Sequence, residues 1–420
     1  MHLYAIPLIF VLIGLALYTV LAGADFGAGM WALLAGSGRA GQRIREHTHN
    51  SMAPVWEANH VWLIFVLTVT WTAYPTAFGS IASTLSIPLF IAAIGIVMRG
   101  ASYALRAGAS SPRETRLIDT SFSLSSILTP FALGAAVGAI AARRVPVGNA
   151  AGGLLSSWTS PISILIGVLA VASAAYLAAV YLAADAARQG DATLESQFRA
   201  RALAAGLLAG AIAAAGLFVL HDDARPLYEG LLEGDGRPAL VLSALAGVAA
   251  LALVWSSRFE LARYTAALAV AAIVAGWALA QQPVLLPGLT VTQAAAPHDT
   301  LVTVIVAVIV GGAILFPSLA LLFRLVLGGQ LDHAPSHQAS APTPTAGVVL
   351  AASREGLLGR LAAAALVAGF GFLTVADAGW AHGIGVLCLL GFVILGFLAV
   401  APASLAIEAD PQDRSPGTRP

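Results

Sequence analysis

Residues 50–65 of the chain read NSMAPVWEANHVWLIF. Ser51 and the proline three residues later are suitable for the cap and first turn of a helix. The sequence then stays apolar for about twenty residues, which is long enough to cross the hydrocarbon core of a bilayer. Its first turns nevertheless carry Glu57, Asn59 and His60, and Glu57 and His60 share a face because they are three residues apart. Since an ionisable residue inside a membrane is costly, this stretch predicts a membrane helix with a functional acid.

The composition places the whole chain in a membrane. The 420 residues are 59% hydrophobic and 10% charged, and the mean hydropathy is +0.86, whereas a soluble domain carries about 25% charged residues. The formal net charge of zero argues against nucleic acid as a partner. A single cysteine, Cys388, allows no disulfide within the chain and no cysteine metal site.

Apolar segments of helix length recur along the chain and predict an all-α polytopic fold. Eleven of them are expected, nine in a core and two near the C-terminus. They cover residues 3–24, 53–74, 79–98, 118–142, 158–184, 202–220, 238–256, 261–281, 300–327, 357–376 and 383–407.

The order of these segments predicts four regions. Residues 1–329 form a transmembrane core, and residues 330–348, rich in proline, alanine and serine, form a flexible linker. A two-helix extension follows over residues 349–408, and the polar residues 409–420 are expected to be disordered. The N-terminus lacks a basic region and a cleavage signal, so we expect its first helix to be retained.

The placement of arginine predicts the orientation in the membrane. The loops after odd-numbered spans hold most arginines, and the loops after even-numbered spans hold Arg143, Arg144, Arg225 and Arg237. We therefore expect the N-terminus outside and the C-terminus in the cytoplasm of a bacterial cell, in the inner membrane. This orientation puts the end of the first helix and the start of the second at the cytoplasmic face.

Two acids lie near that face. Asp25 is in LAGADFGAGMW at the end of the first span, among glycines that allow close helix contact or a break. Together with Glu57 it suits a proton relay, because a partly desolvated carboxyl group exchanges protons near neutral pH. The alternatives are that Asp25 is a carboxylate at a helix boundary, satisfied by water or backbone, and that Glu57 is a hydrogen-bonded acid that fixes helix packing.

Two basic side chains are further candidates. The imidazole nitrogens of His60 could ligate a metal or a haem iron. A lone intramembrane histidine is more often a hydrogen-bonding partner, however, and a haem needs a second ligand. Arg99, in MRGASYALR, is placed to pair with an acid or a propionate; a snorkelling arginine at the interface is an equally good interpretation. We expect no haem or metal site that is complete within this chain.

Three motifs, which occur in the same order as in a known protein family, carry a resemblance to that family. GADFGAGMW, NSMAPVWEANHVWLI with the downstream WTAYPTAF, and MRGASYALR together resemble subunit II of the cytochrome bd-type quinol oxidases. The resemblance covers about residues 1–329. It implies nine helices, arranged as two four-helix bundles and a peripheral helix, that pair with a homologous subunit I.

The resemblance also implies a division of labour in the complex. Subunit I holds the haems, of types b and d, and the loop that oxidises quinol, while subunit II supports assembly and supplies part of a cytoplasmic proton path. A small accessory subunit, membrane lipids and quinol are the other expected partners. The two acids of the family's proton path correspond to Asp25 and Glu57 in this sequence. Trp56 and Asn59 belong to the same motif as Glu57.

The chain departs from the family pattern at two places. Some members carry glutamine at the position of His60, and an acid is frequent at the position of Ala104, so an ion pair with Arg106 is lost here. A proton-coupled secondary transporter is the main alternative, since a buried carboxylate among helices rich in glycine and proline also describes that class. A purely structural scaffold would differ only in that the acids do not titrate.

Overall fold

The computed structural model describes residues 3–52, 56–106, 111–327, 346–374 and 379–400. The chain divides into two compact units at the bond between Leu321 and Leu322. Nearly all of the described residues are helical, and the fold is the all-α polytopic membrane protein that the sequence predicts.

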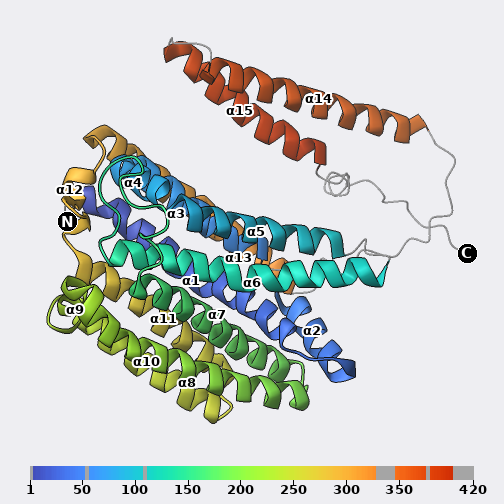
Figure 1. Cartoon of the computed structure of the whole chain (residues 1–420). Coiled ribbons are helices and arrows are strands. Elements are labelled where there is room, and N and C mark those ends of the chain that lie inside the picture. Colours follow the sequence, from blue (N-terminus) through green and yellow to red (C-terminus); the bar gives the residue numbers. More distant parts are fainter. Residues whose placement is uncertain (1–2, 53–55, 107–110, 328–345, 375–378, 401–420) are drawn as a thin grey trace, which may run out of the picture. The chain divides into compact units, whose positions relative to one another are not determined.

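The first unit holds most of the elements (Figure 1), and the last of these, α13, continues into the second unit at its C-terminal end. In chain order they are η1 (Leu3–Ala5), α1 (Ile6–Leu33), α2 (Gly38–Met52), α3 (Trp56–Ala73), α4 (Pro75–Thr84), α5 (Ser86–Arg106), α6 (Pro112–Ala141), α7 (Pro161–Arg188), α8 (Ala192–Asp223), α9 (Arg225–Leu232), α10 (Arg237–Trp255), α11 (Phe259–Gln281), β1 (Val284–Leu286), β2 (Leu289–Thr290), α12 (Val291–Ala294) and α13 (His298–Leu327). The two strands form a small antiparallel hairpin.

Eight of the eleven predicted spans correspond to helices that are, among the described residues, long and apolar enough to cross a membrane. The other three predicted spans correspond to shorter apolar segments, Asn59–Ala73, Leu357–Gly369 and Gly383–Phe392. The span predicted at 79–98 begins in α4 and crosses a break at Leu85 before it continues in α5.

Helix α1 lies at the centre of the first unit. It packs against α2, α3, α6, α7 and α11. The contact with α7 is very close, because a Cβ built on Gly27 would stand 1.9 Å from the carbonyl oxygen of Ala174. Small residues at such crossings let two helix backbones touch, which is how membrane helices pack tightly without a hydrophobic driving force.

The long helices of this unit run side by side, and their connections gather at two ends (Figure 1). We call the end that carries α2 and the turns α7–α8 and α10–α11 the α2 end, and the end that carries α4, α9 and α12 the α9 end. At the α2 end, Arg43 of α2 pairs with Asp191, the N-cap of α8, with 2.5 Å between nitrogen and oxygen. At the α9 end, Arg144 pairs with Asp223, also at 2.5 Å.

Local sequence explains where several helices begin and end. Pro75 prevents α3 from continuing into α4, since proline lacks the N–H donor and disfavours a helical residue before it. Helix α6 begins with a capping box, in which Ser111 accepts a hydrogen bond from the N–H of Glu114 while the Glu114 side chain accepts from the N–H of Ser111.

The second unit contains α14 (Ala346–Thr374) and α15 (Gly379–Val400), which pack against each other. A Cβ on Gly369 would stand 2.8 Å from the Leu389 side chain, so the two helices approach closely there. The predicted linker lies almost wholly outside the described residues, as does the predicted tail at 409–420.

Candidate functional site

A fully buried ion pair joins α1 to α5. Arg99 Nε donates to Asp25 Oδ2 and Arg99 Nη2 to Asp25 Oδ1, both at 2.7 Å, and Nη2 also donates to the main-chain oxygen of Asp25 at 2.6 Å. Both side chains are 0% exposed. A planar guanidinium matches a carboxylate with two parallel hydrogen bonds, and this is the strongest geometry that such a pair adopts.

Helix α6 holds the guanidinium from a second side. Arg99 Nη1 donates to Ser126 Oγ at 2.8 Å, and that hydroxyl donates in turn to the carbonyl of Phe122 at 2.7 Å. The Phe122 ring lies under the guanidinium carbon, with 4.1 Å between that carbon and the ring centroid. A desolvated cation over an aromatic face gains about 2 kcal/mol, so Arg99 is held by hydrogen bonds and by ring contact together.

The carboxylate also accepts from a tyrosine. Tyr103, one turn beyond Arg99 on α5, donates its hydroxyl to Asp25 Oδ1 at 3.1 Å. The glycines around Asp25 make this packing possible: a Cβ on Gly29 would stand 2.0 Å from Ser126 Oγ. Asp25 Oδ1 therefore accepts hydrogen bonds from both Arg99 and Tyr103, while Oδ2 accepts one from Arg99.

This geometry excludes one alternative interpretation for each of Asp25 and Arg99. The suggestion that Asp25 sits at a helix boundary is wrong, because α1 continues for eight residues beyond it, or about 12 Å. The suggestion of a snorkelling Arg99 at the interface is wrong too, since the side chain is fully buried. The charge of each residue is neutralised by the other, and for this reason neither ends its helix.

Glu57, the acid at the centre of the sequence analysis, belongs to α3, which packs against α1. The backbone of Glu57 lies in the first turn of α3, but the side chains of Trp56 and Glu57 are outside the described part of the structure. The neighbouring Asn59 is buried and donates to the carbonyl of Leu21 on α1 at 3.3 Å. Helix α3 thus begins against the same helix that carries Asp25.

His60 also faces α1. Its ring packs edge-on against those of Tyr18 and Phe26, with centroid distances of 6.3 and 6.2 Å. Ala104, where the family pattern often has an acid, is exposed on α5. The Arg106 side chain lies outside the described residues.

Three contributors to the site were not singled out from the sequence, namely Tyr103, Phe122 and Ser126. The signal that could have found Ser126 is the run SFSLSS near the start of the span predicted at 118–142, because buried serines need hydrogen-bond partners. Tyr103 gave no such signal, because one tyrosine near a helix end is common at a membrane interface.

Helix α2 covers the site from the α2 end. Gln42, Arg43, Glu46 and Asn50 are exposed, whereas Ile44, His47, Thr48 and Met52 are buried. His47 Nε2 lies 3.0 Å from the carbonyl oxygen of Leu182 on α7. His49 stacks on the ring of Tyr103, with 5.4 Å between centroids and 27° between planes. The surface helix is therefore in direct contact with a residue that touches Asp25.

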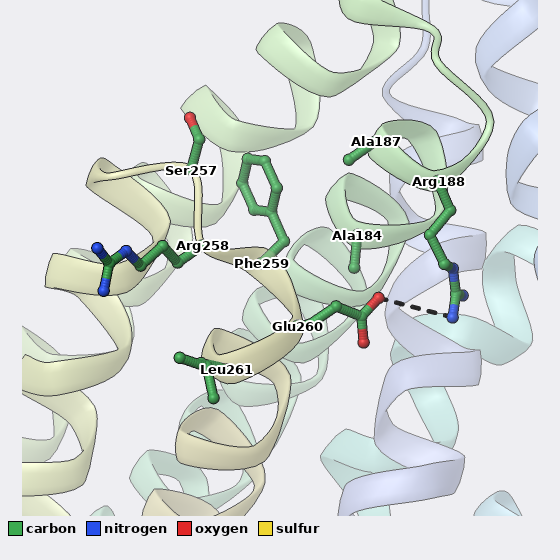
Figure 2. A pocket seen from close by; sticks show the side chains of 8 residues that line it. All are labelled: Ala184, Ala187, Arg188, Ser257, Arg258, Phe259, Glu260 and Leu261. Atoms are coloured by element: carbon green, nitrogen blue, oxygen red, sulfur yellow. Dashed lines mark ion pairs between the residues drawn. The ribbon is translucent and has the colours of Figure 1, made fainter.

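A hollow of about 340 Å³ at the α2 end is the other candidate site (Figure 2). It lies between the end of α7 and the start of α11. Arg188 faces Glu260 across 3.6 Å, while Arg258 points the opposite way, and the floor consists of alanines and Phe259. Because the charged groups are paired or diverge, they form no converging set that could act on one ligand.

Comparison with known proteins identifies the class to which this arrangement belongs. The family model for cytochrome bd terminal oxidase subunit II matches residues 3–326. Among curated proteins, cytochrome bd ubiquinol oxidase subunit 2 of Bacillus subtilis is 28% identical over 114 residues, which are 27% of this chain and 33% of that protein. Cytochrome bd-I ubiquinol oxidase subunit 2 of Escherichia coli is 26% identical over 121 residues, or 29% of this chain and 31% of that protein.

These matches span about a third of the length of the curated relatives, whereas the structural match is much longer. A chain of the bd oxidase from Geobacillus thermodenitrificans matches with a TM-score of 0.66 and 26% identity, covering 78% of this chain and 99% of that one. The family model, the relatives and the fold agree with the resemblance carried by the motifs. The chain belongs to the cytochrome bd terminal oxidase subunit II family.

Proposed function

We propose that the chain is subunit II of a bd-type terminal oxidase, a complex that oxidises quinol and reduces oxygen to water, and that it pairs with a subunit I. The observation that carries this proposal is the family match across residues 3–326, joined to a fold that covers 99% of a bd oxidase chain. In this proposal the core covers residues 1–329, and the linker, the extension over residues 349–408 and the tail follow it.

The chain's part in the chemistry is to move protons. Reduction of oxygen to water consumes protons, and if these come from the cytoplasm the reaction builds a membrane potential without pumping. Glu57 at the start of α3 and Asp25 on α1 are the acids of this route. Asn59 supports the assignment, because its bond to Leu21 holds the start of α3 against α1.

The haems belong to subunit I in this proposal. The fit of a haem to this chain can be tested on its described histidines. His47 is engaged by a main-chain carbonyl, His49 by Tyr103, and His60 lies between two aromatic rings. His221 and His298 are exposed and contact the adjacent aspartates. Since each of these described imidazoles already contacts another group of the chain, we derive no step through a haem in this chain.

The arginines support a cytoplasmic location for the α2 end in a bacterial inner membrane. Among the described residues, Arg39, Arg43, Arg45, Arg113, Arg188, Arg199, Arg258 and Arg263 lie at or near that end, and Arg143, Arg144, Arg225 and Arg237 lie at the α9 end. Such an excess is typical of the cytoplasmic side. The C-terminus is cytoplasmic and the N-terminus outside under this orientation.

The test is affinity purification of the tagged chain from its native membrane, followed by a reduced-minus-oxidised spectrum. The proposal predicts haem b and haem d bands and a larger co-purifying membrane subunit. A haem-free chain that purifies alone, from membranes that retain oxygen-consuming activity, would contradict it and favour the proton-coupled transporter.

A further inference from the structure

A second hollow lies at the α9 end, where the loop between α6 and α7 passes α4 (Figure 1). Its volume is about 310 Å³, which is at the lower limit for a ligand pocket and suits a small polar group. The lining includes Arg143, Arg144, Ser156 and Ser157, and both of its charged residues are the arginines. The hollow therefore has the chemistry of an anion site.

The two arginines differ in their electrostatic surroundings. Arg144 pairs with Asp223 at 2.5 Å, so its charge is balanced within the chain. Arg143 is exposed, and its guanidinium forms no ion pair or hydrogen bond with any residue that the structure describes. Within the described part of the chain, the hollow thus carries one uncompensated positive charge.

The backbone at Arg143 is unfavourable for an arginine. Helix α6 ends in a Schellman motif, in which the N–H of Arg143 donates to the carbonyl of Ile140 and the N–H of Arg144 to that of Ala139. Arg143 takes the left-handed position of this motif, with φ at +56°, which glycine usually occupies. Under the proposed orientation it also lies in an outer loop, where arginine is scarce. Neither the turn nor the orientation accounts for this arginine, whereas an anion in the hollow does.

The loop side of the hollow offers hydrogen-bond donors. Ser157 is 3% exposed and lines the hollow, yet its hydroxyl bonds to no residue within the described ranges. Two glycines bring the main chain close to the hydroxyls: a Cβ on Gly153 would stand 2.2 Å from Ser156 Oγ, and one on Gly152 2.9 Å from Ser157 Oγ. Because a nearly buried hydroxyl needs a partner, an anion in the hollow would supply the missing acceptor.

Helix α4 holds this loop in place. Ser80 Oγ accepts a hydrogen bond from the N–H of Gly148 at 3.0 Å, and Ser83 Oγ accepts one from the N–H of Ala150 at 2.8 Å. A loop that is fixed before binding loses little conformational entropy when the ligand arrives. The donors of the hollow are therefore already in position for a ligand.

The same loop exposes apolar side chains. Val147, Leu154 and Leu155 are 40%, 47% and 63% exposed, and the two leucines directly precede Ser156 in the sequence. Exposed apolar residues beside a basic pocket match a ligand that has a charged head and hydrocarbon chains. At the end of a bundle of membrane-spanning helices, a phospholipid has this chemistry.

We propose that the hollow binds the phosphate of an anionic phospholipid from the leaflet at the α9 end. Arg143 is the ion-pair partner of the phosphate, Ser156 and Ser157 donate hydrogen bonds to it, and the two leucines contact the acyl chains. Because both charged lining residues are arginines, a headgroup that carries an ammonium group is disfavoured. Phosphatidylglycerol should therefore bind better than phosphatidylethanolamine.

The test is native mass spectrometry of the tagged full chain, purified in detergent from its native membrane with the partners that it retains, and titrated with phosphatidylglycerol. Arg143→Gln removes the charge and should weaken lipid binding about tenfold, as expected for the loss of a hydrogen bond to a charged group. The matched control is Arg237→Gln, which removes an exposed arginine at the same end but outside the hollow. This variant should bind the lipid like the wild type.

A second variant, Arg143→Gly, separates binding from folding. Glycine suits the left-handed backbone at this position, so without added lipid the variant should be at least as resistant to heat as the wild type. It should nevertheless bind phosphatidylglycerol as weakly as Arg143→Gln. A fall of heat resistance and of lipid binding together in both variants would mean that Arg143 holds the turn, and would overturn the proposal.

Equal lipid binding by Arg143→Gln and the wild type would also overturn the proposal, as would equal losses in Arg143→Gln and Arg237→Gln. Phosphatidylethanolamine that binds as tightly as phosphatidylglycerol would contradict the assigned headgroup. Inorganic phosphate is the probe for a soluble anion, and if it displaced the lipid from the wild type, the commitment to a lipid would be wrong. Because the measured quantity is bound lipid, and not haem content or oxygen consumption, each of these outcomes leaves the proposed function unaffected.

Discussion

Two ion pairs in this molecule have nearly the same atoms and distances but opposite surroundings. Asp25 and Arg99 meet at 2.7 Å with both side chains at 0% exposure, whereas Arg144 and Asp223 meet at 2.5 Å with the arginine 41% exposed. Coulomb attraction is several times stronger in a protein interior than beside water, but so is the cost of leaving either partner alone. Burial, and not the distance between the charged atoms, therefore decides how much each pair matters for stability.

The buried pair also differs in how many elements it joins. It fixes α1 to α5, and through Ser126 and Phe122 it includes α6. The surface pair joins the ends of α6 and α8, and Asp223 also accepts a hydrogen bond from the N–H of Ile162 at the start of α7. The buried pair connects three helices inside the membrane-spanning part, whereas the surface pair connects helix ends.

The largest effect is expected from Arg99→Ala. The substitution leaves Asp25 as a buried, unpaired charge, and breaking such a pair costs about 3–5 kcal/mol. The midpoint of heat-induced loss of the complex, measured by gel filtration of purified membrane protein, should fall sharply. The double variant Asp25→Leu with Arg99→Met removes both charges and should recover much of the loss. A single variant as stable as the wild type would show that the buried pair is not what holds the helices.

Next in size is Gly27→Ala, which tests whether the close packing that buries the pair is needed. The new Cβ would meet the Ala174 carbonyl at 1.9 Å, so α1 and α7 must separate. Overpacking of this kind costs about 1–3 kcal/mol. The matched control is Gly210→Ala in α8, where a Cβ meets no atom within 4 Å. That variant should be neutral or slightly stabilising in the same heating assay, and equal losses in both would argue against the packing account.

A small effect is expected from Arg144→Gln at the α9 end. An exposed ion pair contributes about 0–1 kcal/mol to the free energy of unfolding, and salt weakens it. The difference in heat stability between variant and wild type should shrink when the salt concentration is raised. A loss as large as that of Arg99→Ala would contradict the contrast between the two pairs.

The smallest effect concerns Asp191, which caps α8 and pairs with Arg43. The N–H of Leu194, first of all, and then the Arg43 guanidinium lower the pKa of Asp191 below its ordinary value of 3.8. Because the folded-state pKa is the lower one, the contribution of Asp191 is present above about pH 4 and is lost as the pH falls through the folded value. Asp191→Asn should therefore be less stable than the wild type at neutral pH and equal to it at strongly acid pH.

Much of this fold could be predicted from the sequence, and the reason is physical. A helix that crosses a bilayer needs about 20 consecutive apolar residues, so spans can be recognised from hydropathy. The lengths of α1 and α5 could not be predicted in the same way. Asp25 and Arg99 look like helix boundaries when each is seen alone, and only their contact, between residues 74 positions apart, makes both suitable for a helix interior.

The site was predicted only in part for the same reason. Asp25, Arg99 and Asn59 were singled out as unusual residues in apolar surroundings, and the structure brings them to neighbouring parts of α1, α3 and α5. Ser126 and Phe122 look ordinary in a sequence, because a serine and a phenylalanine fit any membrane helix. Their importance comes from lying next to Arg99, and single-sequence patterns do not contain that information.

The most direct test of the account is proton uptake by the Glu57→Gln complex after an oxygen pulse, measured beside its haem spectrum. The substitution removes a titratable group and nearly keeps the volume. The account predicts normal haem content with slower proton uptake and oxygen consumption, and recovery of much of the rate in Glu57→Asp. Unchanged rates in Glu57→Gln, with the haem spectrum intact, would contradict the claim that this chain relays protons.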